Sequence, residues 1–302
     1  MLRVWENMYL KNIKRMNILV TGGRGQLGCA LRKVSHNYPD LKLFLTDMPE
    51  ADITDKSGIS KLAESLKADM IINCAAYTAV DKAEAEADLA RKINTDGARV
   101  LAEVCREKGI PLIQISTDYV FDGNSNQPLK EEDPANTPLG VYGKTKRDGE
   151  IAVAESGCHA AIVRTAWLYS EFGSNFVKTM LRLAESRHEL GVVYDQLGTP
   201  TYAPDLAEAI LDLATQGITG CEIYHYTDEG TCSWYDFAHE IFDLAHVRMK
   251  LNAIETRQYP TPAQRPRYSV LDKGKIKAKG IKVPHWRDSL RKCIAELRKE
   301  SL

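Results

Sequence analysis

The sequence has no long apolar run and no surplus of one charge. No window approaches about 18 uninterrupted apolar residues, so a membrane-spanning helix is not expected. The segment MLRVWENMYLKNIKR lacks the apolar core and cleavage site of a signal peptide, so we expect a cytoplasmic protein. The 40 Lys and Arg residues nearly balance the 41 Asp and Glu residues, and the net charge of -1 gives no reason to expect a nucleic-acid or membrane partner.

Cysteine and histidine patterns of metal sites are also missing. The 7 cysteines are scattered without a C-x-x-C pair, which favours reduced, buried thiols over a disulfide framework or a zinc site. None of the 7 histidines has metal-ligand spacing, and H-E-x-x-H does not occur. We therefore predict no protein-ligated metal, although assistance by Mg²⁺ cannot be read from the sequence.

What is present, from Met16 onwards, is an alternation of strand-length apolar runs with helical periodicity. Strands are predicted over 17–22, 41–47, 69–75, 111–117, 160–166 and 190–195. Because each parallel strand needs a crossover that returns over the sheet, this alternation predicts a doubly wound α/β fold with a parallel, Rossmann-like sheet.

The same pattern suggests how the chain is divided. We assign 16–168 to a dinucleotide-binding domain, to which parts of 189–230 return. Residues 169–302 form mainly a smaller, loop-bearing lobe that binds substrate, because the alternation loosens there and Pro and Lys become frequent. Residues 1–15 carry no legible pattern and are treated as an N-terminal extension of unknown role.

The first predicted strand runs into TGGRGQLG, a glycine loop followed by a helical segment. Gly22, Gly25 and Gly28 let the backbone approach a pyrophosphate at a helix N-terminus. Asp47 lies about 20 residues further on, where an acid accepts hydrogen bonds from an adenosine ribose. Because Asp47 would repel a 2′-phosphate whereas Arg24 would attract one, NADH and NADPH both stay open as cofactors.

Further cofactor contacts are expected in the loop and after the second and third strands. They are Gln26 and Leu27 in the glycine loop, Asp52 and Ile53 in ADIT, and Ala75, Ala76 and Tyr77 in NCAAYT. The ADIT residues are placed to meet the adenine, and the two alanines are small enough to let a dinucleotide pass. Ordinary packing of a strand end is an equal alternative for both stretches.

The string VYGKTK places Tyr142 and Lys146 four positions apart, on one face of a helix. A phenol with a reference pKa of ~10 is a poor acid or base unless its anion is stabilised. The Lys146 ammonium is expected to favour the phenolate, so that Tyr142 can protonate a carbonyl oxygen as hydride reaches its carbon. Thr117, at the end of the fourth strand, is placed to hydrogen-bond the same oxygen. An ordinary amphipathic pair is the alternative for the Tyr and Lys alone.

This combination resembles the extended short-chain dehydrogenase/reductase superfamily. The strings YTAVDKAE, STDYVFDG, VYGKTKRDGE, RTAWLY, NFVKTMLRLA, DQLGTPTYAPDLA and PTPAQRPRYSVLD are similar to those of the dTDP-4-dehydrorhamnose reductase family. The resemblance covers nearly the whole chain from Met16. It implies reduction of the C4 ketone of dTDP-4-dehydro-β-L-rhamnose to dTDP-L-rhamnose by hydride transfer from NADH or NADPH, with Tyr142 as general acid. A nucleotide-sugar substrate is thus expected, and a homodimer is left open.

The resemblance also implies substrate contacts after several strands and in the C-terminal lobe. These are Thr78, Val80, Asp81, Thr117, Asp118, Trp167, Asn175, Phe176, Lys178 and Arg265. Arg265, between prolines, is expected to clamp phosphate bidentately, and Asn175 with Lys178 to suit a diphosphate or a base. Ordinary surface or core packing is the alternative. Ala30 stands where an acid occurs in some relatives, so no metal site is carried over.

Three other functions compete with reduction. A nucleotide-sugar dehydratase needs a neighbouring Asp and Glu, whereas Asp118 is followed by Tyr119. An epimerase needs no carboxylate pair and stays open. So does a non-catalytic regulatory subunit that keeps the fold and the cofactor.

Overall fold

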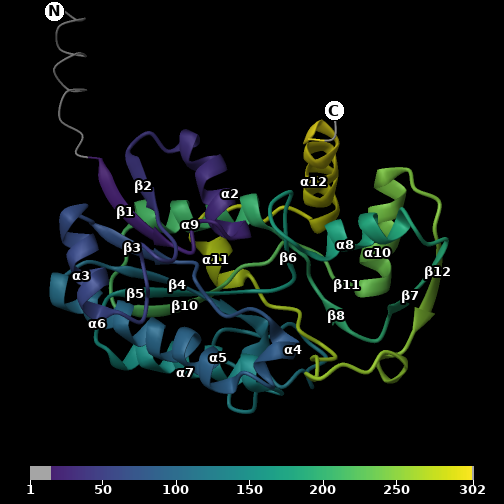
Figure 1. Ribbon diagram of the computed structural model, residues 1–302, viewed down its shortest axis with the longest axis horizontal. Coiled ribbons are helices and arrows are strands. Elements are labelled where there is room, and N and C mark those ends of the chain that lie inside the picture. The colour runs from purple at the N-terminus through teal and green to yellow at the C-terminus, as the bar shows by residue number, and fades with distance from the viewer. Residues whose placement is uncertain (1–14, 301–302) are drawn as a thin grey trace, which may run out of the picture.

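The computed structural model describes residues 15–300, so 1–14 of the predicted extension lie outside the described residues. Its centre is a 6-stranded parallel sheet (Figure 1). In spatial order the strands are β10 (Cys221–His225), β5 (Ala160–Thr165), β4 (Leu112–Thr117), β3 (Met70–Asn73), β1 (Met16–Thr21) and β2 (Leu41–Leu45). The direction of winding reverses between β1 and β3, which is where a doubly wound sheet opens a ligand crevice. The predicted fold class is confirmed.

The predicted strands differ from the observed ones at the sixth position of the sheet. The strand predicted over 190–195 forms as β7 (Glu189–Val193), but it pairs with β12 (Lys250–Ile254) outside the central sheet. The sixth position is taken by β10, which was not predicted. β10 is an edge strand whose first residues are exposed, so its apolar signal is weak.

Helices cover both faces of the sheet, and each face has its own apolar core. One face carries α2 (Gln26–Val34), α9 (Ala203–Gln216) and α11 (Gly274–Ala278), and the other carries α3 (Lys56–Ser65), α6 (Ala98–Lys108) and α7 (Val141–Glu155) (Figure 1). Ile18 packs into the first core and its neighbour Leu19 into the second, as the period of two along a strand requires. Strands buried on both faces explain the continuous apolar runs.

Several short helical segments lie between the longer helices and strands. They are η1 (Ser35–Asn37), α4 (Val80–Ala83), α5 (Ala87–Arg91), the π-helical turn η2 (Lys92–Gly97) and η3 (Asp118–Val120). The η2 turn continues directly into α6 and contacts α7: Asn94 donates to the Thr145 hydroxyl at 3.1 Å, and Thr95 donates to the Thr145 carbonyl at 2.9 Å. These bonds fix η2 against α7.

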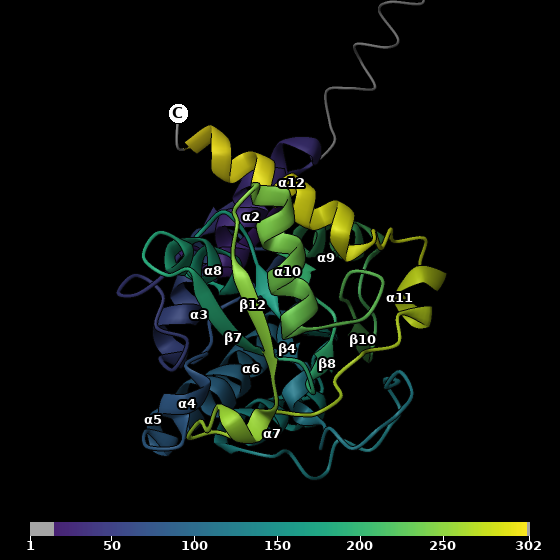
Figure 2. The ribbon, with the colours of Figure 1, turned by 90° about the vertical axis from the view of Figure 1, so that its right-hand side faces the viewer.

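After residue 168 the chain returns to the sheet with α9, β10 and α11, and its other segments build a smaller lobe around Tyr169, Phe237 and Trp286. It contains β6 (Leu168–Tyr169) paired with β9 (Thr201–Tyr202), β8 (Leu197–Gly198) paired with β11 (Cys232–Ser233), the β7–β12 pair, and α8 (Phe176–Ala184), α10 (Trp234–Ala245), η4 (Thr256–Gln258) and α12 (Trp286–Glu300). Figure 2 shows α10 beside β7 and β12 on the outer side of this lobe. None of the helices between residues 15 and 300 combines the length and the apolar character that a membrane crossing requires.

Candidate active site

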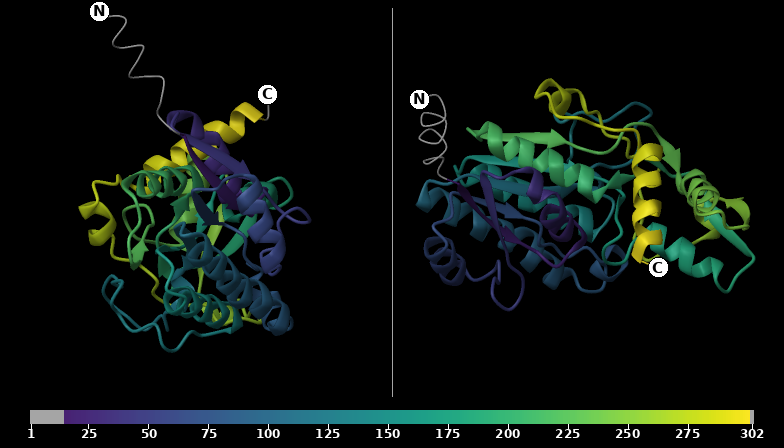
Figure 3. Two further views of the ribbon diagram at one scale, coloured as in Figure 1. Left: turned by 90° about the vertical axis from the view of Figure 1, so that its left-hand side faces the viewer. Right: turned by 90° about the horizontal axis from the view of Figure 1, so that it is seen from above.

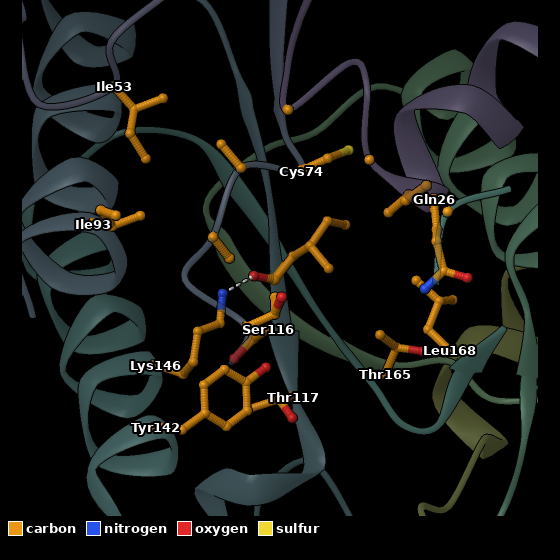
Figure 4. Close-up of a pocket in the computed structure, with 18 of the residues that line it drawn as sticks. Gln26, Ile53, Cys74, Ile93, Ser116, Thr117, Tyr142, Lys146, Thr165 and Leu168 are labelled. Atoms are coloured by element: carbon orange, nitrogen blue, oxygen red, sulfur yellow. Dashed lines mark hydrogen bonds between the residues drawn. The ribbon is translucent and has the colours of Figure 1, made fainter. Parts of the chain in front are cut away.

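A cavity of about 860 Å³ follows the carboxyl ends of the central strands. It is bordered by Gln26 after β1, Ala75 after β3, Thr117 at the end of β4, Tyr142 on α7 and Trp167 after β5. Figure 4 shows side chains from these separate segments turned toward one space. Parallel strands end at one edge, so residues far apart in the sequence meet there.

The glycine loop carries no side chains at Gly22 and Gly28, because neighbouring backbone leaves no space for a Cβ there. Gly22 has φ +68°, and a Cβ built on it would lie 2.6 Å from the Ala75 amide nitrogen. A Cβ on Gly28 would lie 2.6 Å from the Gly22 carbonyl oxygen, so Gly28 packs beneath the loop rather than facing the cavity. Gly25 caps α2 without a side-chain hydrogen bond. The first N–H groups of α2 therefore remain available, and the loop fits a pyrophosphate.

The loop after β2 holds the residues expected at the adenosine end. β2 ends before Asp47, whose carboxylate accepts from the Arg24 amide at 3.0 Å. The Arg24 guanidinium is exposed and lies 3.6 Å from the Glu50 carboxylate. Asp52 accepts from both the amide and the hydroxyl of Thr54, and these bonds hold the pKa of Asp52 below its usual value. The Asp52 carboxylate is thus used within its own turn.

Tyr142 and Lys146 both border the cavity, and burial controls their protonation. Lys146 is 5% exposed, and its Nζ donates to the Ile115 carbonyl at 2.7 Å. Burial lowers the pKa of Lys146 to about 8, against the opposite effect of Glu150. Burial also raises the pKa of Tyr142 to about 12, although hydrogen bonding with Thr117 acts the other way.

The net pKa of Tyr142 is therefore raised in the protein alone, and the stabilisation of its phenolate by Lys146 stays a prediction. Removing a phenolate from water costs more free energy than its neighbours return, so the neutral phenol is favoured. A protonated phenol is nevertheless the form that a general acid needs.

Thr117 and Asp118 lie beside this phenol. The Thr117 hydroxyl donates to the Asp118 carboxylate at 3.0 Å and accepts from the Tyr119 amide at 3.3 Å. Asp118 is 1% exposed, and burial raises its pKa to about 6. The Tyr119 ring meets the Tyr142 ring edge-on, with centroids 5.5 Å apart. Tyr142 is thus held from one side by a second aromatic ring.

A buried ion pair lies one helical turn beyond Lys146. Glu150 accepts from Arg164 at 2.9 and 2.7 Å and from the Ser116 hydroxyl at 2.5 Å. Arg164 belongs to β5 and Ser116 to β4, so the pair ties α7 to two central strands. Together with the bonds from η2, this network holds the backbone that carries Tyr142.

Several predicted site residues do not border the cavity. They are Gly28, Tyr77, Asp81, Asn175, Phe176, Lys178 and Arg265. The Tyr77 backbone is held by the Asn94 side chain, which accepts at 2.9 Å and donates at 3.1 Å. Arg265 donates to both carboxylate oxygens of Asp81, at 2.6 and 2.7 Å. A phosphate clamp by Arg265 would therefore require this pair to separate.

Three further predicted substrate residues make contacts inside the lobe. The Asn175 side-chain oxygen Oδ1 accepts from the Lys178 amide at 3.1 Å and so caps α8, while its Nδ2 donates to Gln26 at 2.9 Å. The Lys178 ammonium donates to the Glu171 carbonyl at 2.9 Å. Phe176 packs with the aromatic core of the lobe. Any contact of Asn175 or Lys178 with substrate would compete with these bonds.

The remaining predicted residues border the cavity. They are Gly22, Arg24, Gly25, Gln26, Leu27, Asp47, Asp52, Ile53, Ala75, Ala76, Thr78, Val80, Thr117, Asp118, Tyr142, Lys146 and Trp167. Trp167 has φ +47°, and its indole stacks on Trp234 with centroids 3.5 Å apart.

Other bordering residues were not predicted. They include Thr54, Cys74, Leu89, Lys92, Ile93, Ser116, Thr165, Gly173 and Ser174. Ser116 and Thr165 stand at predicted strand ends, so their position was readable. Lys92 and Ile93 lie on η2, and only packing against α7 brings that turn to the cavity. Within residues 15–300 no group of His, Cys, Asp or Glu side chains could hold a metal ion.

A doubly wound sheet, a glycine loop after its first strand and a Tyr–Lys pair over its carboxyl edge define a dinucleotide-binding protein of the short-chain dehydrogenase/reductase type. The family model described as RmlD substrate binding domain matches residues 16–299. A dTDP-4-dehydrorhamnose reductase from Aggregatibacter actinomycetemcomitans is 43% identical over 289 residues, which cover 92% of this chain and 98% of that relative. The chain therefore belongs to the dTDP-4-dehydrorhamnose reductase family, as the sequence motifs predicted.

Solved structures agree with this assignment. A dTDP-4-dehydrorhamnose reductase from Clostridium acetobutylicum has 43% identity and a TM-score of 0.89, covering 94% of this chain and 100% of that chain. One from Bacillus anthracis, solved in complex with NADP, has 37% identity and a TM-score of 0.89, covering 93% of this chain and 99% of that chain.

Proposed function

We propose that this protein reduces the C4 ketone of dTDP-4-dehydro-β-L-rhamnose to dTDP-L-rhamnose, with NADH or NADPH as the reductant. The observation that carries the proposal is that the glycine loop, Thr117, Tyr142 and Lys146 border one cavity in a member of this family. The relative from Bacillus anthracis, solved with NADP, supports a nicotinamide dinucleotide at the glycine loop.

The residues of the cavity supply the acid half of the reaction. When bound, the reduced nicotinamide provides the hydride that reaches C4. Tyr142 gives its phenolic proton to the ketone oxygen, which becomes the new hydroxyl group. The Lys146 ammonium, one helical turn away, stabilises the phenolate that remains. The Thr117 hydroxyl turns its single proton from the Asp118 carboxylate to the same oxygen and so orients it.

The choice between NADH and NADPH stays open in this proposal, because Asp47 and Arg24 both border the adenosine end of the cavity. Assistance by Mg²⁺ and a homodimeric state likewise stay open, and the cytoplasmic location stays a prediction. Activity assays with a chelator and light scattering of the purified protein would test the first two.

Removing the Tyr142 hydroxyl tests the proposed acid directly. We expect Tyr142→Phe to lower kcat by about 10²–10⁴-fold, because general acid catalysis contributes this much. The dissociation constant of NADPH should change little. The measurement is oxidation of NADH or NADPH in the presence of dTDP-4-dehydrorhamnose, with the product identified by mass spectrometry.

Tyr194→Phe is the matched control, because Tyr194 is 46% exposed and lies outside the cavity. Cofactor binding without any ketone-dependent oxidation in the unaltered protein would favour the regulatory subunit. A change in sugar stereochemistry without net oxidation would favour the epimerase. Full activity of Tyr142→Phe would refute the assigned acid alone.

A further inference from the structure

The side chain of Gln26 joins the glycine loop to the C-terminal lobe. Gln26 is the first residue of α2 and borders the cavity. Its Oε1 accepts from the Ser170 hydroxyl at 3.0 Å and from Asn175 Nδ2 at 2.9 Å. Figure 4 shows this side chain reaching from the glycine loop toward Leu168. One amide oxygen thus contacts two residues that lie far along the chain.

The loop over 170–175 is shaped to fit against Gln26. Gly173 has φ +59°, and a Cβ built there would lie 3.2 Å from Gln26 Cγ, so a larger residue would push the loop away. The loop is also bonded to itself, because Asn175 Nδ2 donates to the Ser170 carbonyl at 2.7 Å and the Phe172 amide donates to the Ser170 hydroxyl at 3.1 Å. Gly173 and Ser174 of this loop border the cavity.

Asn175 extends this contact into the lobe. Its side-chain oxygen caps α8, whose third residue, Lys178, is bonded in turn to the Glu171 carbonyl. Both ends of the Asn175 amide are therefore engaged, one with Gln26 and one with α8. A change in the position of Gln26 must either break the bond to Asn175 or move the start of α8.

We propose that Gln26 is a positioning residue that couples cofactor binding at the glycine loop to the order of segment 170–178. The proposal rests on the proposed function only for the identity of the ligands. A dinucleotide that orders the glycine loop also orders Gln26, and Gln26 then holds Ser170 and Asn175 in place. Because coupling between sites is reciprocal, a sugar nucleotide that orders 170–178 would tighten cofactor binding by the same factor.

Hydrogen exchange with NADP⁺ as the probe tests the coupling without any turnover. In the unaltered protein NADP⁺ should slow exchange of the amides in 170–178. Gln26→Met keeps the length but removes the acceptor, so this protection should be lost while protection of the glycine loop persists. Gln26→Glu keeps an acceptor for both donors and should retain the protection. Gln127→Met, at an exposed position, is the matched control.

Asn175→Asp separates the two roles of Asn175, because a carboxylate still caps α8 but cannot donate to Gln26. If both residues act through one bond, the protection should be lost in Asn175→Asp and fall no further in the double variant with Gln26→Met. In turnover, Gln26→Met should raise the KM for the sugar nucleotide by about 5-fold or more, with a smaller effect on kcat.

Equal protection of 170–178 in the unaltered protein and in Gln26→Met, or no protection in either, would overturn the proposal. Absence of binding of both NADP⁺ and NAD⁺ would overturn it as well. If protection behaves as expected but no ketone is reduced, the coupling stands and the proposed reaction fails. If the ketone is reduced but exchange is unaffected by the Gln26 variants, the proposed reaction stands and the coupling fails.

Discussion

At the scale of single residues, burial decides which groups in the cavity carry a proton. It raises the pKa of Tyr142 to about 12 and that of Asp118 to about 6, and it lowers the pKa of Lys146 to about 8. In each case burial shifts the equilibrium toward the uncharged form, because the charged form loses hydration. Near neutral pH the cavity therefore holds a protonated phenol beside a lysine that still carries its charge, the pairing that proton donation to a ketone requires.

Lys146 should control the alkaline side of the pH profile. Below a pH of about 8 its amine is protonated, and above it the ammonium that stabilises the Tyr142 phenolate disappears. We expect kcat/KM to fall as pH rises through about 8. Lys146→Arg should move this decline to higher pH at a lower maximal rate, because a guanidinium keeps its charge but does not reproduce the geometry.

The pH profiles of kcat/KM for the unaltered protein and for Lys146→Arg check this prediction. Lys144→Ala is the control, because Lys144 lies on the same helix but is exposed and outside the cavity. An alkaline decline that stays in place in Lys146→Arg would show that another group is titrating.

At the scale of elements, α7 is held by polar contacts that lie beneath the cavity. Its Glu150 is bonded to Arg164 of β5 and Ser116 of β4, and its Thr145 is bonded to η2. Arg164 also lies over the Phe121 ring, 5.0 Å from its centroid. Apolar packing alone would allow a helix to slide along a sheet, whereas these directional bonds specify one position for Tyr142.

Breaking the buried pair should be costly. Glu150→Gln leaves Arg164, which is 2% exposed, without a counter-charge, so we expect a loss of ~3–5 kcal/mol in the free energy of unfolding. Urea denaturation measures this loss. Adding Arg164→Met should recover part of it, because no buried charge then remains unpaired.

Glu189→Gln serves as the comparison, because the Glu189–Lys250 pair is exposed and its loss should not change stability measurably. An equally small change for Glu150→Gln would mean that water reaches Arg164. The buried pair would then not be what positions α7.

At the scale of the whole molecule, α12 connects the sheet to the smaller lobe (Figure 3). Its Glu296 pairs with Lys33 of α2 at 2.7 Å, and its Ser289 donates to Asp205 of α9 at 2.5 Å. Lys33 also pairs with the buried Glu171 of the lobe at 2.5 Å. These contacts join the sheet to the smaller lobe away from the cavity.

Removal of one hydroxyl should weaken this junction. Ser289 is fully buried, so Ser289→Ala removes the hydrogen bond to Asp205 Oδ2 at a place that water does not reach. The Asp205 carboxylate keeps Lys292 at 3.3 Å, and we expect a loss of about 1–3 kcal/mol in unfolding free energy. Thermal and urea denaturation measure it. Ser65→Ala, at an exposed hydroxyl that bonds only within its own helix, is the matched control. Equal effects of the two variants would contradict a role for Ser289 in the junction.

Local sequence patterns were sufficient for much of the fold and part of the site. The first five predicted strands form at or near the predicted ranges, because apolar runs and their glycine boundaries are local signals. The glycine loop and the Tyr142–Lys146 spacing were readable for the same reason: each depends on a few adjacent residues in one element. The family resemblance could be recognised in the same way, from short strings.

Only the tertiary structure decided which side chains pair across the chain and how strongly burial acts on them. Gln26 meets Asn175 across 149 residues, and Arg265 meets Asp81 across 184, so neither contact leaves a local pattern. The raised pKa of Tyr142 likewise depends on desolvation by segments that the fold brings together. Periodicity specifies which face of an element is apolar, whereas partners and dielectric surroundings are set only once the elements have packed.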